Sequence, residues 1–176
     1  MSENDWFHED VQFVSENGLM NGVDTNRFSP DSALTRAMLI TVLWCLEGEP
    51  VVNYLMPFTD ISYGEWYTEA VRWAAAEGIV NGYEDGTFRH DSEITREQTM
   101  AVLHRYAAYK GLESGVIFPM IPQYNYSLWA ENDILWADMV GLTGNISKDI
   151  FDMTASSDRA EIAAYLRRFC EAFMAD

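Results

Sequence analysis

The chain has 176 residues, of which 28 are acidic and 11 basic, so its formal net charge is −17 at pH 7. Nucleic acid is therefore not an expected partner, because binding to phosphates requires a basic face. A disordered acidic tail is excluded by the aromatic content of 14%, and residues 37–46, the longest nearly continuous apolar stretch, reach only about half the length of a membrane helix, so no membrane insertion is expected.

Internal repetition is the strongest signal in the sequence. A shift of 60 positions places residues 6–43 on residues 66–103 without a gap, with 13 identities in 38 positions. A fainter third copy, at a shift of 63, places Trp129 on Trp66 and Arg159 on Arg96. Repeats of this length are typical of structures in which stacked units share one core. We expect three units, residues 1–52, 53–115 and a degenerate 116–176, that form one compact body.

Each unit is predicted to fold as helix, loop and helix. In the second unit the first helix covers about residues 67–77, where Ala70, Val71 and Ala74 form an apolar stripe and Gly78 supplies a left-handed cap. The second helices share a capping residue at their start: Thr35, Thr95 and Asp158. Gln98 and Glu161 complete capping boxes there, which Met38 in the first unit cannot do. We expect these three second helices to meet around one axis.

An arginine follows each of these caps, at the first helical position: Arg36, Arg96 and Arg159. A cation is unfavourable at a helix N-terminus, so each arginine requires a counter-anion. A bound carboxylate could bridge the guanidinium and the free N–H groups of the first turn. The alternative is an internal ion pair with Asp31, Asp60, Asp91 or another acid, and the residues alone favour this alternative because acids are so numerous.

Aromatic residues also recur at fixed positions. Trp6, Trp66 and Trp129 begin the first helices, where an indole ring could stack on a sugar or pack in the core. Trp73 and Trp136 lie in the middle of their helices and are predicted to be core residues.

Three further residues are candidates for binding a ligand together with these arginines and tryptophans. Gly22 and Gly82 could let a ligand approach the backbone or could serve a turn. Asp60 could bind sugar hydroxyls or cap the turn before Trp66.

These motifs resemble the S-layer homology (SLH) domain family. The second unit carries Phe-Thr-Asp-Ile at 58–61, Gly-Ile-Val-Asn-Gly-Tyr at 78–83, Asp-Gly-Thr-Phe at 85–88 and Ile-Thr-Arg-Glu at 94–97. The resemblance implies an all-α fold in which three helix-loop-helix SLH repeats form a pseudo-threefold spindle around a central three-helix bundle. It also implies a function, the non-covalent anchoring of an exported bacterial protein by binding of an anionic, often pyruvylated, cell-wall polysaccharide in the grooves between repeats. On this resemblance the residues expected to bind the polysaccharide are Arg36, Arg96, Arg159, Trp6, Trp66, Trp129, Asp60, Gly22 and Gly82.

The remaining expectations concern what the chain lacks and where it acts. We expect no enzymatic activity, because no spacing singles out a pair of carboxylates of the kind a glycosidase requires, and we expect no cofactor. We also expect no metal, since the histidines have no ligand partners at the right spacing. Cys45 and Cys170 are predicted to be buried thiols rather than a disulfide. The expected location is the bacterial cell wall, with the signal peptide absent from this sequence, and the expected state is a monomeric pseudo-trimer. A protein-interaction module on the cell surface is the alternative function.

Overall fold

The structure is a computed structural model that describes residues 5–22, 27–112, 124–144 and 152–174. Within these ranges the chain is helical, with α1 (His8–Glu16), α2 (Arg36–Leu46), α3 (Thr68–Ala76), α4 (Arg96–Tyr109), the 3₁₀ turn η1 (Leu128–Ala130), α5 (Glu131–Met139) and α6 (Arg159–Phe173). The expected all-α class is confirmed. The expected boundary between the second and third units, at residues 115 and 116, lies outside the described residues.

The helix ends follow the predicted local signals. Thr35, Thr95 and Asp158 cap α2, α4 and α6 with their side chains, and the capping boxes of α4 and α6 are both complete. Gly78, with φ of +70°, ends α3 in the left-handed conformation that the sequence predicts. The first helix of the second unit is one residue shorter at each end than expected.

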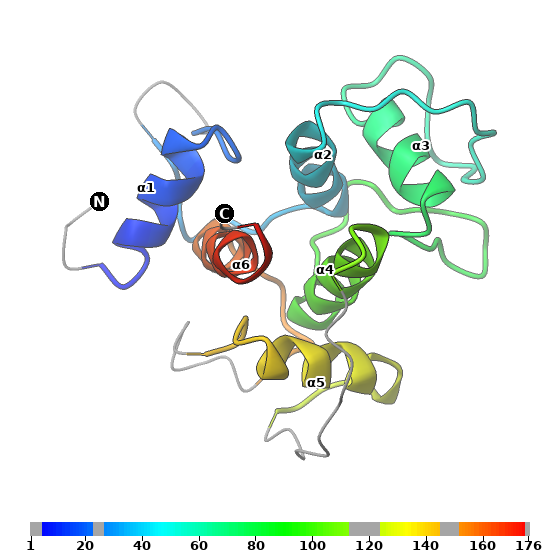
Figure 1. Cartoon of the computed structure of the whole chain (residues 1–176). Helices are drawn as coiled ribbons and strands as arrows, with labels where there is room; N and C mark the ends of the chain where they lie inside the picture. The colour runs from blue at the N-terminus through cyan, green and yellow to red at the C-terminus, as the bar shows by residue number, and fades with distance from the viewer. Residues whose placement is uncertain (1–4, 23–26, 113–123, 145–151, 175–176) are drawn as a thin grey trace.

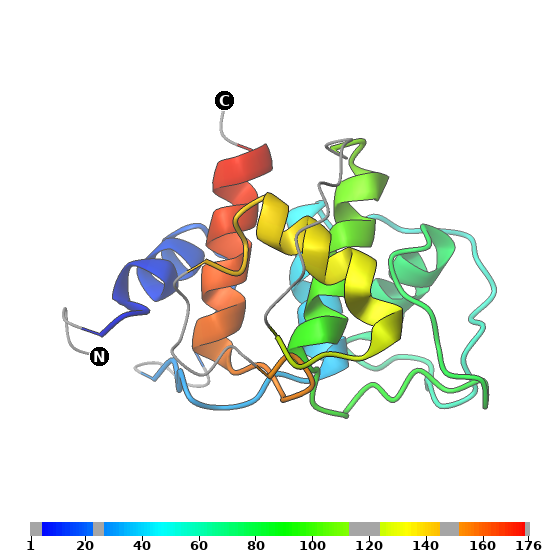
Figure 2. The same ribbon diagram turned by 90° about the horizontal axis from the view of Figure 1, so that it is seen from below.

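Three helices occupy the middle of the molecule and three surround them. Figures 1 and 2 show α2, α4 and α6 side by side in the centre, with α1, α3 and α5 on the outside. The outer helices α1, α3 and α5 pack on α6, α2 and α4, respectively. Each outer helix therefore packs on the central helix of another unit, and buried side chains from all six α-helices form one core cluster. Because the core is shared, the units do not fold as separate bodies.

Backbone hydrogen bonds link the segments that precede the central helices. Leu34 N–H donates to the carbonyl of Ser157, Ser157 N–H to that of Ile94, and Ile94 N–H to that of Leu34, over 3.1, 2.8 and 2.9 Å. These bonds form a closed ring, because each segment donates to one neighbour and accepts from the other. The ring places the first turns of α2, α4 and α6 against the loops of neighbouring units.

Candidate functional site

The N–H groups in the first turns of the central helices are already hydrogen-bonded. The first N–H of each helix donates to a backbone carbonyl of another unit: Arg36 to Ser92, Arg96 to Ala155 and Arg159 to Ser32, over 2.9 to 3.0 Å. The second N–H groups do the same, and the third donate to the capping side chains. The prediction that an anion binds free N–H groups here is therefore wrong, because the neighbouring loops supply the acceptors. Of the two kinds of donor expected to bind the anion, the guanidinium groups remain.

Arg36 extends from α2 into the loop of the second unit. Its Nε donates to the carbonyl of Phe88 over 2.9 Å, and its Nη atoms lie 3.4 and 3.5 Å from Gln98 Oε1 and the carbonyl of Asn81. The guanidinium lies over the rings of Tyr83 and Phe88. Arg36 is 7% exposed, and burial lowers its pKa from the usual value. No carboxylate among the described residues forms a salt bridge with it.

Arg159 repeats this arrangement between α6 and the first unit. Its Nε donates to the carbonyl of Phe28 over 2.7 Å, its Nη2 donates to the carbonyl of Asn21, and the guanidinium lies over the Phe28 ring. Burial lowers the pKa of Arg159 as well. Within the described ranges it too has no salt bridge to a carboxylate.

Arg96 differs from the other two arginines because a carboxylate faces it. Its Nη2 lies 2.7 Å from Glu161 Oε1, and its Nε is 3.0 Å from both oxygens of Glu161. The two side chains are 12% and 2% exposed. Burial lowers the pKa of Arg96, but the hydrogen bonds and charge of Glu161 outweigh it and the net shift is upward. Arg96 thus has the internal ion pair that the residues alone favoured.

One sequence position explains the difference between the three arginines. Each arginine lies near a side chain of a neighbouring central helix, three residues after the cap of that helix. This side chain is Met38 for Arg159, Gln98 for Arg36 and Glu161 for Arg96. Methionine and glutamine leave the guanidinium charge uncompensated, whereas glutamate neutralises it. This signal was present in the sequence, but its use requires knowing which helix each arginine faces.

The tryptophans divide as their positions predict. Trp73 and Trp136 are buried, with 1% and 2% exposure, so the prediction that they are core residues is confirmed. Trp6, Trp66 and Trp129 are 46%, 57% and 54% exposed, so core packing does not account for them. Trp6 and Trp66 stand edge-on against the next residue in the chain, Phe7 and Tyr67.

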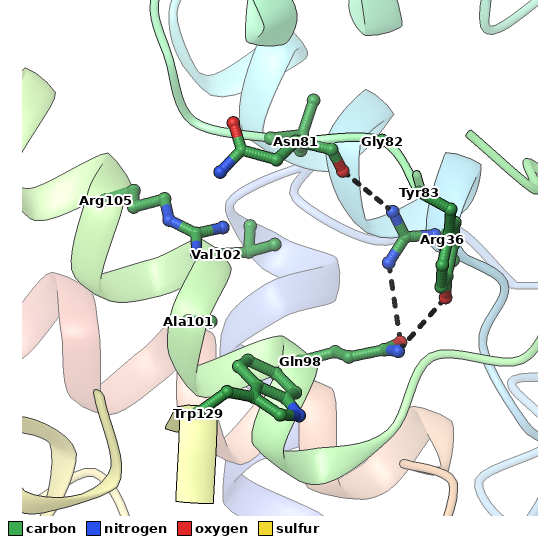
Figure 3. A pocket seen from close by; sticks show the side chains of 10 residues that line it. Arg36, Asn81, Gly82, Tyr83, Gln98, Ala101, Val102, Arg105 and Trp129 are labelled. Carbon is green, nitrogen blue, oxygen red and sulfur yellow. Dashed lines mark hydrogen bonds between the residues drawn. The ribbon is translucent and has the colours of Figure 1, made fainter. Parts of the chain in front are cut away.

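Two hollows each bring one of the three arginines together with one of the exposed tryptophans, whereas Arg96 and Trp6 line neither hollow. Groove 2, of about 170 Å³, is lined by Arg36, Val80, Asn81, Gly82, Tyr83, Gln98, Ala101, Val102, Arg105 and Trp129 (Figure 3). Groove 1, of about 520 Å³, has Arg159, Trp66, Asn21, Gly22, Met38, Val42 and Cys45 among its lining residues. Each groove therefore combines a buried arginine from one unit, an Asn-Gly loop from the next and an exposed indole from the one after.

The corresponding helix position in the third unit carries a large side chain that lies in the core. Tyr165 matches Val42 and Val102, which line grooves 1 and 2, in the repeat alignment, yet it is fully buried. Together with the pair of Arg96 and Glu161, it makes the third position the least suited to an anionic ligand.

Asp60 has a role that the sequence analysis did not consider. Its two carboxylate oxygens accept hydrogen bonds from the backbone N–H groups of Phe88 and Arg89, both over 2.7 Å. Arg89 has a positive φ of 59°, so the carboxylate holds a strained bend in the loop. Asp60 therefore shapes the loop whose Phe88 carbonyl receives Arg36, and it does not cap the turn before Trp66.

Gly82 lines groove 2, but a contact within the protein explains why it is glycine. A Cβ atom here would lie 2.5 Å from the Phe58 ring and 2.7 Å from the Thr87 carbonyl oxygen. At Gly144, its counterpart in the third unit, a Cβ atom would make an ordinary contact of 3.8 Å with the Gly141 carbonyl oxygen and no closer contact with the described residues.

Alanine substitutions at Gly82 and Gly144 should differ in how much they destabilise the chain. Gly82→Ala should destabilise the chain by about 1–3 kcal/mol, because backbone and a packed ring must shift, whereas Gly144→Ala should stay within about 0.5 kcal/mol. Urea unfolding monitored by circular dichroism measures both changes. Equal stability of the two variants would contradict the close packing of Gly82.

Glu97 was missed by the sequence analysis and positions one wall of groove 2. Its carboxylate, in a residue only 6% exposed, accepts hydrogen bonds from the backbone N–H and the hydroxyl of Ser127, over 2.8 and 2.9 Å. Ser127 precedes η1, which carries Trp129. Glu97 therefore fixes the turn that places the Trp129 indole at groove 2.

The remaining predictions concern thiols, metals and membranes. Cys45 and Cys170 are free thiols as expected, but Cys45 is exposed and Cys170 partly exposed, so the prediction that they are buried is wrong. In the described part of the chain no cluster of three His, Cys, Asp or Glu side chains could hold a metal ion. No helix among the described residues has the length and apolar character needed to cross a membrane.

Comparison with known proteins finds a family whose model matches two segments of the chain. Residues 1–37 and 57–100 match the family model of the S-layer homology domain. These segments contain Trp6, Gly22, Arg36, Trp66, Gly82 and Arg96. The SLH resemblance is therefore confirmed in the first and second units, while the third unit, which supplies Trp129 and Arg159, lies outside the matched segments.

Named relatives agree with this match. Cell surface glycoprotein 1 of Acetivibrio thermocellus is 29% identical over 145 residues, which is 77% of this chain and 6% of the relative. The cellulosome-anchoring protein of the same organism is 29% identical over 143 residues, covering 76% of this chain and 30% of the relative. Amylopullulanase of Thermoanaerobacterium thermosulfurigenes is 25% identical over 169 residues, covering 93% of this chain and 9% of the relative. The chain thus corresponds to a small part of each of these longer proteins.

Proposed function

We propose that this chain anchors an exported bacterial protein non-covalently to the cell wall, by holding an anionic polysaccharide in grooves 1 and 2. The chain itself is a binding module without catalytic activity. We further propose that the chain is a monomer and that its three units are related by a pseudo-threefold axis. The ring of hydrogen bonds between Leu34, Ile94 and Ser157 supports that symmetry.

The observation that carries the proposal is the state of Arg36. Its guanidinium is buried and makes no described salt bridge, yet it borders a hollow that also contains the exposed indole of Trp129. Burial of a charge is costly unless an opposite charge is close, and backbone carbonyls compensate it only in part. A carboxylate entering groove 2 would complete the compensation, while the indole offers its face to the sugar ring. A pyruvate ketal provides such a carboxylate on a sugar.

Groove 1 has the same elements in a larger and more apolar space. Arg159 replaces Arg36, Trp66 replaces Trp129, and Met38 replaces Gln98. We infer that groove 1 binds a second segment of the polysaccharide. The third position, where Glu161 neutralises Arg96, does not bind the anionic group.

The relatives' names support anchoring as the role of the shared segment. One relative is a cell surface glycoprotein and another is a cellulosome-anchoring protein. An amylopullulanase carries a similar segment over only 9% of its length, which fits a module attached to proteins of different activities.

A binding measurement with two forms of one polymer tests the proposal. Purified wall polysaccharide, with and without its pyruvate ketals, is titrated into the chain while tryptophan fluorescence is recorded. We expect binding of the ketal-bearing polymer and an affinity at least tenfold lower after mild acid removes the ketals, since a charge-assisted hydrogen bond contributes about 1.5–3 kcal/mol. Equal affinity for the two forms would contradict recognition of the anion.

The alternative, a protein-interaction module, rests on the ion pair of Arg96 with Glu161, which uses one of the three arginines internally. It predicts no binding of either polymer and capture of another wall-surface protein. Arg36 and Arg159, without described carboxylate partners, favour the polysaccharide.

A further inference from the structure

Groove 2 contains a second arginine for which the proposed function has no role so far. Arg105 comes from α4, three residues after Val102, and lines the hollow together with Arg36. Figure 3 shows the two guanidinium groups on opposite sides of the hollow, Arg105 beside Asn81 and Arg36 beside Tyr83 and Gln98. Two cations thus face one small and partly enclosed space.

The two guanidinium groups differ in how they are held. Arg36 donates to two backbone carbonyls and to Gln98. Arg105 is only partly exposed, and within the described ranges neither a hydrogen bond nor an ion pair to it is found. In a chain with 28 acidic residues and 11 basic ones, two neighbouring arginines without a carboxylate partner are unexpected.

Electrostatics explains what such a pair requires. Each positive charge raises the energy of the other. Burial is the main cause that lowers the pKa of Arg36, and the positive charges of Arg89 and Arg105 lower it further. An anion placed between them would relieve the repulsion and would supply acceptors for the unused N–H groups of Arg105. The hollow of about 170 Å³ has room for one acidic substituent and part of a sugar ring.

We propose that Arg105 is a second ligand-binding cation of groove 2, and that it restricts this groove to sugars carrying an anionic group held between Arg36 and Arg105. This inference rests on the proposed function and assigns different specificities to the two grooves. Groove 1 has Cys45 at the position that matches Arg105, so a single cation serves that groove and a less acidic part of the polymer binds there.

The third unit gives an internal comparison. Arg168 matches Arg105 in the repeat alignment, and its Nη1 donates to the carbonyl of Leu142 over 2.8 Å. An arginine at this position can therefore have a structural role, and Arg168 has a hydrogen-bond partner within the protein. The missing partner of Arg105 among the described residues distinguishes it from Arg168.

Substitutions at matched positions test the assignment. Arg105→Gln should weaken binding of the ketal-bearing polysaccharide about tenfold in isothermal titration calorimetry and should leave binding of the ketal-free polymer unchanged. Arg72→Gln, which removes a positive charge from the same unit outside groove 2, is the control and should have almost no effect. Cys45→Arg should strengthen binding of the ketal-bearing polymer, because it gives groove 1 the second cation. The melting temperature of Arg105→Gln should match that of the parent chain.

A small anion makes the test independent of the polysaccharide. Pyruvate is titrated into the chain labelled with ¹⁵N-arginine, and the Nε–Hε signals of Arg36 and Arg105 are recorded. The inference predicts that both signals shift together with one dissociation constant. If the parent chain binds neither polymer but both signals shift, the anion site stands and the anchoring function fails. If the polymer binds as proposed but Arg105→Gln behaves like Arg72→Gln and the Arg105 signal does not move, the assignment of Arg105 is overturned and the anchoring function stands.

Discussion

Replacement of Arg36 by alanine should cause the largest loss of polysaccharide binding of any single substitution in this chain. The guanidinium is the buried cation of groove 2, and removal of a charge-assisted hydrogen bond costs about 1.5–3 kcal/mol, so the affinity at groove 2 should fall roughly 10- to 100-fold. Arg36→Lys should recover only part of the affinity, because an ammonium group cannot present two parallel N–H groups to a carboxylate. Isothermal titration with the ketal-bearing polymer measures both variants.

Stability must be measured beside affinity, because Arg36 also donates to the carbonyls of Phe88 and Asn81. Gln98→Met is the informative companion variant, since it gives groove 2 the residue that groove 1 has at this position. It should retain the fold and bind the anionic polymer at least as well as the parent chain. If Arg36→Ala and Arg36→Lys keep full affinity in chains shown to be folded, Arg36 is not the ligand cation.

Replacement of Arg96 by alanine should instead lower the stability of the fold without abolishing polysaccharide binding. Glu161, with a side chain 2% exposed, would be left as an uncompensated buried carboxylate, and breaking such a pair costs about 3–5 kcal/mol. For a chain of this size the melting temperature should fall by about 10 °C. The affinity of the remaining folded chain for the polymer should change less than twofold, because grooves 1 and 2 do not include Arg96.

Two variants control for this effect. Arg96→Ala combined with Glu161→Gln should recover part of the lost stability, since the amide does not carry the buried charge. Glu171→Gln, which removes an exposed pair with Arg167 on the same helix, should cost at most about 0.5 kcal/mol. A melting temperature of Arg96→Ala close to that of the parent, together with a strong loss of binding, would show that Arg96 binds the ligand.

Local signals in the sequence predicted the local structure well. Thr35, Thr95 and Asp158 cap their helices as predicted. The two predicted capping boxes, at Thr95 and Asp158, are both formed, because a capping box depends only on residues within one turn. The separation of core tryptophans from exposed ones was also predictable. Trp73 and Trp136 lie within helices whose periodicity buries them, whereas Trp66 begins its helix.

The site was harder to predict, because it depends on contacts between units. The sequence shows three equivalent arginines, yet the structure places only Arg36 and Arg159 at grooves 1 and 2 and pairs Arg96 with Glu161. The arginine of one unit faces the helix of the next, and no pattern within a unit reveals this. The occupation of the first N–H groups by neighbouring loops has the same cause.

Asp60 and Arg105 illustrate two further limits. Asp60 belongs to a recognisable motif, but its role depends on the fold of a loop 28 residues away, which periodicity does not report. Arg105 lies on a helix among apolar residues and belongs to no motif. Only its position in groove 2 and its lack of a described partner distinguish it from other surface arginines.

A crystal structure of the chain with an oligosaccharide carrying one pyruvate ketal would test the central claim most directly. The account predicts that a ketal carboxylate oxygen lies about 2.7–3.2 Å from the Arg36 guanidinium, with the sugar ring against Trp129 in groove 2. An oligosaccharide bound outside grooves 1 and 2, or one whose carboxylate contacts neither Arg36 nor Arg159, would contradict it.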